Sequence, residues 1–593
     1  MTKRQLLTLL LTIALVFSML TGCGKSTETT SPESATPNTA ESESPGSETE
    51  SQNPETEESQ PEEPELDEDI PIRYKNKGVL SFLPEEPITI PKFSEMECEK
   101  IDVEPLLAKM DALIEKAKVC EDADEFLSDY YAVLPELYHY YQMSTLSYIR
   151  YTQDHMRYST KETFDYFLEP DELIAQKDDE LCEVLAESPM RDDLEKAYFS
   201  GPYYGEDFFD DYEPVSEEYW DLSMQEGELF QQYYDLTADG IYINDNNDVA
   251  RNHDSLAELF VEMVKVRNQQ AIELGYENYM EYAYPKLFQR DYSPEEIKEF
   301  LKQVKTCLVP LAKHDEIWDA NSVEEWLPDS WRAYAKLQAF AKQMGGTIWD
   351  AFRFMNAYEL YDIATNARKM NVAYVNYLPE YETPVIIING GSYTTFAHEF
   401  GHFVDRFDNY NEGSSDISEI YSQLMEYLYL KHDDVPQEDR NKNIQADIGG
   451  TLTYAIFREC AYADFELQVY ELAPEELTPE NIDAIFFECM KNYGVLRGAE
   501  GEIEGKRWIA YHHFFDRAGY VIGYATSAIA VLEICAMDAE NPGAGLDAFN
   551  RLLDRTPGKQ FSAVIEEAGL ENPFEASTLN KIAEFIKKTF ELE

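Results

Sequence analysis

The sequence has few basic residues and few histidines. Its 593 residues contain 48 Lys and Arg against 116 Asp and Glu, and the formal net charge is −68 at pH 7. This acidic balance argues against nucleic acid or an anionic surface as a partner, because like charges repel. Histidine occurs only nine times. Two histidines at a spacing that suits a metal ion are therefore an uncommon coincidence in this chain.

Paired cysteines are also lacking. After Cys23 there are seven widely spaced cysteines and no Cys-x-x-Cys pattern, which argues against a metal knuckle or a dithiol redox site. An odd number leaves at least one thiol unpaired. We interpret these residues mostly as small buried apolar side chains, although an exported protein could form a disulfide. The seven are Cys98, Cys120, Cys182, Cys307, Cys460, Cys489 and Cys535.

The N-terminal apolar run is short. It extends from Leu6 to Leu20 after a basic start, which is too little for a stable membrane span but typical of a secretory signal, here residues 1–22. The ending Leu20-Thr21-Gly22-Cys23 resembles a bacterial lipobox. This resemblance implies that Cys23 becomes a lipid-modified first residue, anchored to the outer face of the cell membrane. An ordinary signal peptide cut nearby is the alternative.

Residues 23–70 have no aromatic side chain. Ser, Thr, Pro and Glu recur, and residues 24–70 carry 15 acidic side chains against one Lys. Such a segment cannot bury enough apolar surface to offset the entropy of ordering, so we predict a disordered tether. Leaving out the +2 of residues 1–23 and the −14 of residues 24–70 leaves −56 on residues 71–593. That charge favours solubility and cationic substrates.

The remaining 523 residues are enough for a large core or two lobes. Ser293-Pro294-Glu295-Glu296 predicts a helix start with a reciprocal cap. Other stretches repeat apolar residues at three- and four-residue spacing, which is typical of helices that pack on one face. We therefore predict a mainly α-helical fold. The four stretches with this spacing are 103–119, 124–141, 255–274 and 294–311.

The pattern changes to β-type at residues 371–378 and 383–389. Both runs are rich in β-branched and aromatic residues, and Pro379-Glu380-Tyr381-Glu382 joins them, which predicts a hairpin. Gly390 and Gly391 then turn the chain into the next helix. An edge strand at this place could pair with an extended peptide backbone. A purely structural sheet is the equal alternative.

The residues that carry chemistry follow this hairpin, in His398-Glu399-Phe400-Gly401-His402. On a helix, residues four apart project from nearly the same face, so His398 and His402 can bind one zinc ion. Glu399 lies beside the ion's open position and can take a proton from bound water. This is the chemistry of a zinc-dependent peptidase.

Catalytic zinc usually has a third protein ligand. Glu419 and Glu426 are the candidates, on a predicted helix over residues 416–428. Each has an ordinary alternative. Asp416 and Glu419 fit the spacing of a helix cap with its reciprocal partner, and Glu426 could be a solvated charge. Asp405 is a further candidate, as a hydrogen-bond partner of a zinc-bound histidine, and an exposed charge is the equal alternative.

The motif followed by Glu419-x-x-Ser422-Gln423-x-x-Glu426 resembles the M3 family of zinc peptidases, the thimet oligopeptidase and oligoendopeptidase F group. Residues 264–279, 290–297 and 558–570 resemble oligoendopeptidase F as well, so the similarity extends from about residue 225 to 590. The resemblance implies Glu419 as third ligand, with Glu426 as the second choice, and one zinc per chain. It also implies a zincin-type helical fold with two lobes, which we place at residues 71–240 (N-terminal lobe) and 241–593 (catalytic lobe).

The segment Tyr511–Thr526 supplies candidates for stabilising the negative oxygen that forms during hydrolysis, since phenol and imidazole groups can donate to it. M3-like enzymes have such a segment near the C-terminal end, and Tyr520 and Tyr524 match it best. They could equally form one buried helix face. The family's substrate-contacting histidine corresponds to His512 or His513.

The sequence thus predicts a zinc endopeptidase that hydrolyses short oligopeptides outside the cell, with Glu399 as general base. A monomer is expected. Two alternatives belong to other classes: a peptide-binding lipoprotein, which would explain anchor and tether but not the metal motif, and a catalytically inactive relative that serves as a scaffold.

Overall fold

The computed structural model describes residues 70–75, 86–197, 209, 215–238, 246–320, 330–370, 372–409, 414–498, 501–556 and 558–592. The predicted signal sequence, Cys23 and nearly all of the predicted tether lie outside these residues. They therefore stay predictions.

Helices dominate the described chain, in agreement with the apolar periodicity. Those before the hairpin are α3 (Glu104–Ala117), α4 (Ala123–Gln153), α5 (Tyr158–Ala186), α6 (Arg191–Ala197), α7 (Glu217–Ala238), α8 (Asn246–Glu273), α9 (Tyr279–Lys286), α10 (Pro294–Cys307), α11 (Asp315–Ala320), α12 (Ser330–Met344) and α13 (Gly346–Ala357). Those after it are α14 (Tyr393–Asn409), α15 (Ser415–His432), α16 (Gln437–Gly450), α17 (Glu459–Tyr470), α18 (Pro479–Asn492), α19 (Glu502–Gly505), α20 (His513–Asp516), α21 (Ile522–Glu540), α22 (Ala544–Leu553), α23 (Phe561–Glu567) and α24 (Ala576–Thr589).

Shorter helical pieces complete the chain. A π-helical turn, η5 (Thr451–Arg458), joins α16 to α17. The 3₁₀ turns are η1 (Phe93–Glu95), η2 (Val309–Lys313), η4 (Pro379–Tyr381) and η6 (Arg507–Ala510).

The predicted helices are confirmed, with different ends. Helix α10 begins with the predicted cap: Ser293 Oγ accepts from the Glu296 amide, and the Glu296 carboxylate accepts from the Ser293 amide. Helix α4 begins near the predicted residue 124 but continues to Gln153. Its second half is buried on nearly every side, from Tyr140 to Ile149. A helix buried all round has no polar face, so its apolar spacing could not predict where it ends.

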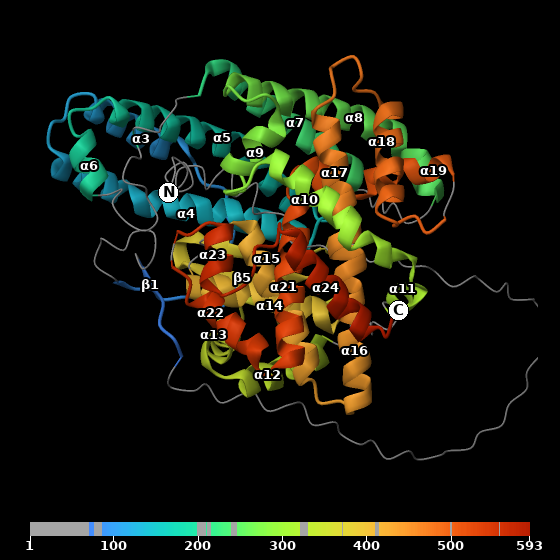
Figure 1. Ribbon diagram of the computed structural model, residues 1–593. Helices are drawn as coiled ribbons and strands as arrows, with labels where there is room; N and C mark the ends of the chain where they lie inside the picture. The colour runs from blue at the N-terminus through green and yellow to red at the C-terminus, as the bar shows by residue number, and fades with distance from the viewer. Residues whose placement is uncertain are drawn as a thin grey trace, which may run out of the picture.

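The helices form two layers (Figure 1). Helices α3 to α9 and α17 to α19 lie in the upper layer of this view, and α12 to α16 with α21 to α24 lie below. Helix α4 runs along the boundary and packs against the predicted hairpin. The buried side chains of both layers belong to one continuous hydrophobic cluster. The positions of helices that are distant in sequence are therefore coupled through this core.

The hairpin is confirmed and belongs to a small three-stranded sheet. Strands β4 (Ala373–Leu378) and β5 (Thr383–Ile388) are antiparallel, with Ala373 opposite Ile388 and Leu378 opposite Thr383. Strand β3 (Tyr361–Asp362) pairs in parallel with the other side of β5, which gives the order β3-β5-β4. A separate short pair joins β1 (Tyr74–Lys75) to β2 (Glu86–Pro87). Strand β5 leads directly into the turn before α14.

The edge of β4 is already engaged by the protein. Arg406 Nη1 donates to the carbonyl of Val375 (3.0 Å), and the Tyr377 amide donates to the side chain of Asn376 (2.8 Å). Backbone groups that are bonded in this way are not available to a peptide. At these two groups, the structural sheet fits better than a docking strand.

The first described residues lie against the end of α14. Arg73, which is buried, donates to the carbonyls of Phe407 (2.7 Å) and Arg406 (3.3 Å) in the last turn of that helix. A cation at a helix C-terminus satisfies free carbonyls and favours the helix dipole. The segment that follows the tether therefore helps to hold the helix that carries the metal motif.

One helix among the described residues, α21, is long and apolar enough to cross a membrane. Most of it is buried inside the protein, including 72% of its most apolar 18-residue window. It packs against α15, η5, α22 and α24, as a core helix does.

All seven cysteines after Cys23 are free thiols. Five of them are buried, which confirms the interpretation of most as small apolar core residues. The five are Cys120, Cys182, Cys460, Cys489 and Cys535.

Candidate active site

The motif helix α14 begins at a turn that only glycine can make without strain. Gly391 has a φ of +106°, and a Cβ there would lie 2.8 Å from the Thr395 side chain. Ser392 then caps the helix: its amide donates to Thr395 Oγ1 (3.0 Å), and its hydroxyl accepts from the Thr395 amide (3.2 Å). These contacts set the direction in which the next two turns project His398 and His402.

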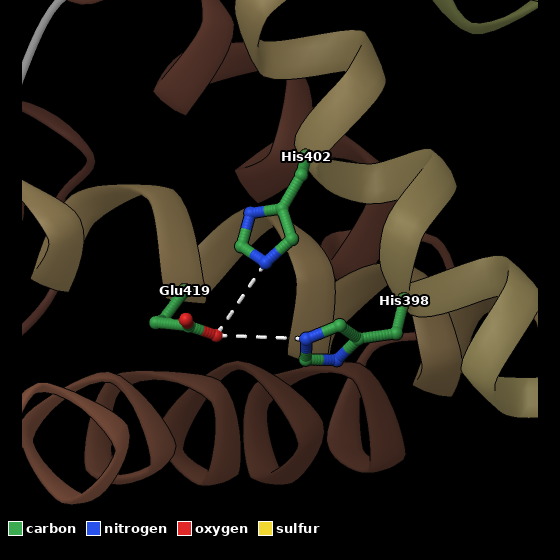
Figure 2. A group of neighbouring side chains, drawn as sticks. All are labelled: His398, His402 and Glu419. Atoms are coloured by element: carbon green, nitrogen blue, oxygen red, sulfur yellow. Dashed lines mark ion pairs between the residues drawn. The ribbon is translucent and has the colours of Figure 1, made fainter. Parts of the chain in front are cut away.

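Three side chains from two helices converge on one point. Nε2 of His398 lies 3.6 Å from Glu419 Oε2, and Nε2 of His402 lies 3.7 Å from the same oxygen (Figure 2). The histidines come from α14 and the glutamate from α15, and all three are buried. Their donor atoms lie within 4.8 Å of one another, which is close enough to hold one metal ion.

These donors fit a catalytic metal. Within the described chain, Nε2 of His398 is buried and has no hydrogen-bond partner. An unsatisfied buried nitrogen is costly unless a ligand completes its coordination. Two imidazole nitrogens and one carboxylate oxygen are also a usual protein ligand set of catalytic zinc, which keeps a further position open.

A glycine in the motif allows Glu419 to reach the histidines. A Cβ at Gly401 would lie 2.6 Å from both Ser422 Cα and the Tyr421 carbonyl oxygen. Because no side chain fits there, α14 and α15 can pack backbone to backbone at this point. Glu419, one turn before Ser422, is thereby placed opposite the motif.

Glu426, the second choice for third ligand, has a different place. Its Oε1 lies 2.7 Å from Nδ1 of His398, on the side of the ring away from Glu419. The matching nitrogen of His402 lies 2.9 Å from Ser418 Oγ. Partners of this kind orient metal-binding imidazoles. Glu426 is 3% exposed, so the alternative of a solvated charge is wrong.

Two other expectations for this region are wrong. Asp416 does not cap α15 with Glu419, because Ser414 is the N-cap residue and Asp416 is paired with the buried Arg290. Asp405 does not bond the histidines. Its carboxylate accepts from Arg555 Nη1 (3.0 Å) and Asn409 Nδ2 (3.1 Å), because the α22–α23 connection brings Arg555 to that side of the helix.

Glu399 is fully buried beside the three predicted ligands, and neither of its carboxylate oxygens has a hydrogen-bond partner in the described part of the protein. Burial raises the pKa of Glu399 to about 8; His398 opposes this rise and Glu419 adds to it. A buried carboxyl group with two free oxygens is suited to accept and return a proton.

The predicted tyrosines occupy two different places. Tyr520 is 4% exposed, and its hydroxyl donates to Oε1 of Glu419 (2.5 Å). The hydroxyl of Tyr524 lies 3.3 Å from Nε2 of His513 instead. The two rings are 5.2 Å apart, so both belong to the site. Tyr520 therefore orients Glu419, the predicted third ligand, whereas the Tyr524 hydroxyl is not bonded to Glu419 in the described contacts.

The two predicted histidines also have different surroundings. His513 is fully buried and contacts Tyr524, whereas His512 is partly exposed and lies against His513, with the rings tilted by 43° and their centroids 4.0 Å apart. The sequence interpretation missed Asp516, whose Oδ1 lies 3.3 Å from Nδ1 of His513. The three-residue spacing from His513 was a signal that could have indicated it. His512, His513 and Asp516 are close enough for a cation, but both ring nitrogens of His513 already have partners.

The fold and the site together define a metallopeptidase: a mainly helical protein in which a His-Glu-x-x-His helix meets a glutamate from the next helix. Comparison with protein families gives the particular family. The model of the peptidase M3 N-terminal domain matches residues 93–213, and that of peptidase family M3 matches residues 344–584. The chain belongs to the M3 family of metallopeptidases.

Solved structures show the same fold. A structure assigned as an oligoendopeptidase F has a TM-score of 0.72 and 20% identity, and PZ peptidase A with an inhibitor has 0.71 and 21%; each match covers 84% of this chain and 99% of the other. A Bacillus anthracis protein assigned as an oligoendopeptidase F has a TM-score of 0.68 and 19% identity, with 84% and 98% covered. No curated protein matches the chain. The match to residues 93–213 extends the family to a part of the chain where the sequence resemblance was not evident.

Proposed function

We propose that this M3 peptidase is a zinc-dependent endopeptidase that hydrolyses short oligopeptides outside the cell. The observation that carries the proposal is the convergence of Nε2 of His398 and Nε2 of His402 on Oε2 of Glu419, beside a Glu399 carboxyl with no other partner in the described chain. The choice of oligopeptides rests on the likeness to structures assigned as oligoendopeptidase F.

His398, His402 and Glu419 would hold the metal. When bound, zinc would polarise the scissile carbonyl, lower the pKa of a water molecule and favour the ionised form of nearby carboxyl groups. Glu426 and Ser418 keep the histidine rings oriented, since they bond the nitrogens that face away from Glu419.

The chain's own residues perform the proton transfers. Glu399 takes the proton from the attacking water, because its two free oxygens lie beside the predicted ligands, and then returns it to the leaving amine. Tyr524 takes no part in these transfers: its hydroxyl donates a hydrogen bond to the carbonyl oxygen as negative charge develops there. At rest that hydroxyl is held by His513, whose other nitrogen is held by Asp516.

The intact catalytic groups favour an enzyme over an inactive scaffold or a peptide-binding lipoprotein. A protein that only bound peptides would not need Glu399 buried without a partner among the described residues, which is costly to folding. Because the three predicted ligands and Glu399 lie at one site, neither alternative is favoured.

Removal of the metal tests this function. We expect 1,10-phenanthroline to abolish cleavage of a quenched fluorescent peptide mixture by the purified protein, and about one equivalent of zinc to restore it, because one three-ligand site needs one ion. Cleavage products should include internal fragments, as an endopeptidase makes. Full activity in metal-free protein, or release of terminal residues alone, would contradict the proposal.

The place of action follows from the N-terminal sequence. We propose that a lipid on Cys23 anchors the protein to the outer face of a bacterial cell membrane, with the acidic segment as tether. We expect Cys23→Ser to abolish incorporation of labelled palmitate and to release the protein from the membrane fraction. Membrane retention of the variant would contradict the anchor. We also propose that the protein is a monomer.

A further inference from the structure

Two buried arginines hold the segment that carries the predicted oxyanion donors, residues 512–524. Arg290, between α9 and α10, donates from Nη1 to the Gly519 carbonyl (2.6 Å) and from Nη2 to the Tyr520 carbonyl (3.2 Å). Arg267, on α8, donates to the carbonyls of Phe514 (3.2 Å) and Phe515. Arg267 thus bonds the backbone just after His513, and Arg290 bonds it one turn before Tyr524.

Of these two arginines, only Arg290 bonds a residue of α15, the helix that carries Glu419. Its Nε and Nη2 form a forked pair with the carboxylate of Asp416 at 3.1 and 3.0 Å, in the first turn of α15 and one turn before Glu419. The hydroxyl of Tyr292 donates to the same carboxylate. Ser527, on α21, donates to the Asp416 carbonyl (2.9 Å). One guanidinium therefore bonds both the Glu419 helix and the tyrosine segment.

The ion pair between Arg290 and Asp416 is buried and closely packed. The side chains of Arg290 and Asp416 are both 0% exposed. A Cβ at Gly523 would lie 2.5 Å from Oδ1 of Asp416, so the start of α21 touches the ion pair directly. The rings of Tyr284 and Phe288 cover the guanidinium at 4.6 and 4.5 Å. Since a guanidinium stays charged and its fork has fixed geometry, a small displacement of either partner breaks several bonds at once.

Arg267 can be compared with Arg290, because it bonds the same segment but has a different carboxylate partner. Its carboxylate partner is Glu226 on α7 (2.5 Å), and it also bonds Tyr470 on α17. Neither residue lies on α14 or α15. Arg267 therefore holds the tyrosine segment to the body of the protein, without a bond to the helices that carry the predicted metal ligands.

We propose that Arg290 is a positioning residue that sets Glu419 relative to Tyr520 and Tyr524, whereas Arg267 positions the tyrosine segment alone. The inference rests on the proposed function. The Tyr520 hydroxyl bonds Glu419 directly, so the position of Tyr520 and the orientation of Glu419 are coupled. Arg290 bonds the Asp416 side chain on one side of that contact and the Tyr520 carbonyl on the other. Losing this junction weakens metal retention as well as turnover.

The test compares Arg290→Lys and Asp416→Asn with the matched control Arg267→Lys. Lysine keeps the charge but cannot bond a carboxylate and two carbonyls in one plane. Zinc-loaded proteins are exposed to a chromogenic chelator, and the rate of zinc loss is measured beside kcat and KM. We expect Arg290→Lys and Asp416→Asn to lose zinc at least about tenfold faster and to fall in kcat, the size found when partners of metal ligands are changed. Arg267→Lys should keep its zinc half-life within about twofold while kcat falls, because it does not bond the ligand helices.

Circular dichroism checks that each variant is folded. If the single variants unfold, the double variant Arg290→Met/Asp416→Leu removes both buried charges together, which proteins often tolerate, and the same faster loss of zinc is expected of it. Zinc half-lives equal to the parent in the folded Arg290 and Asp416 variants, or equally fast loss from Arg267→Lys, would overturn this inference alone. A parent protein that holds no zinc would overturn the proposed function itself.

Discussion

Glu399→Gln is expected to lower kcat for peptide hydrolysis by about 10²–10⁴-fold, the range that a general base contributes, while zinc stays bound. Glutamine has the same shape as glutamate, but its amide cannot act as a base near neutral pH. Glu399 has no hydrogen-bond partner in the described chain and is not one of the three predicted ligands, so the change leaves the donors of His398, His402 and Glu419 intact. The measurement is kcat and KM on a quenched peptide, with zinc content determined on the same sample.

Glu419→Gln is the matched control for this experiment. It makes the same chemical change one helix away, at a predicted ligand rather than at the base. We expect it to lose zinc and activity together, because an amide oxygen is a weaker zinc donor than a carboxylate. Normal turnover by Glu399→Gln at matched zinc content would remove Glu399 from the mechanism. Normal zinc retention by Glu419→Gln would remove Glu419 from the ligand set.

Tyr524→Phe is expected to lower kcat by about 10²–10³-fold with little change in KM, the effect of losing one oxyanion donor. The hydroxyl would act only when charge develops on the substrate, so the ground state loses little. Tyr520→Phe should differ, because the Tyr520 hydroxyl donates to Glu419. Its main effect is a loss of zinc affinity of about 10–100-fold, as expected for a partner of a metal ligand.

The two phenylalanine variants are therefore controls for each other. Both remove one hydroxyl from rings 5.2 Å apart in the same segment, so they disturb packing to a similar degree. Steady-state kinetics and a competitive zinc chelator separate the two roles. An equal loss of kcat in both variants, with zinc affinity unchanged, would show that the structure does not divide their tasks in this way.

Much of the fold could be predicted from local patterns. The Ser293–Glu296 cap, the amphipathic helices and the hairpin each depend on residues within a few positions of one another, so the sequence carries their signals directly. Helix α4 shows where such signals fail. Its second half is buried on nearly every side, which is decided by packing against the next helix, α5, and the distant strand β4 rather than by its own spacing.

In the candidate site, too, some residues could be predicted from local spacing and others could not. His398, Glu399 and His402 lie within five residues on one helix, and helical geometry alone brings the two imidazoles together. Glu419 and Glu426 could not be separated by such reasoning, since each lies on α15 and each can reach His398. The structure separates them because Gly401 meets the backbone at Ser422, which puts Glu419 at Nε2 of His398 and Glu426 at Nδ1.

The sequence by itself determined the helical class, the His398–His402 motif and the place of the candidate base Glu399, because each depends on short-range spacing along a helix. Only the tertiary structure decided which carboxylate joins the histidines, which tyrosine bonds that carboxylate, and that Asp405 pairs with Arg555. It alone also showed one buried arginine joining Asp416 to the Tyr520 segment, across more than a hundred residues of sequence. The physical reason is that close packing in a shared core selects among side chains that local geometry leaves equivalent.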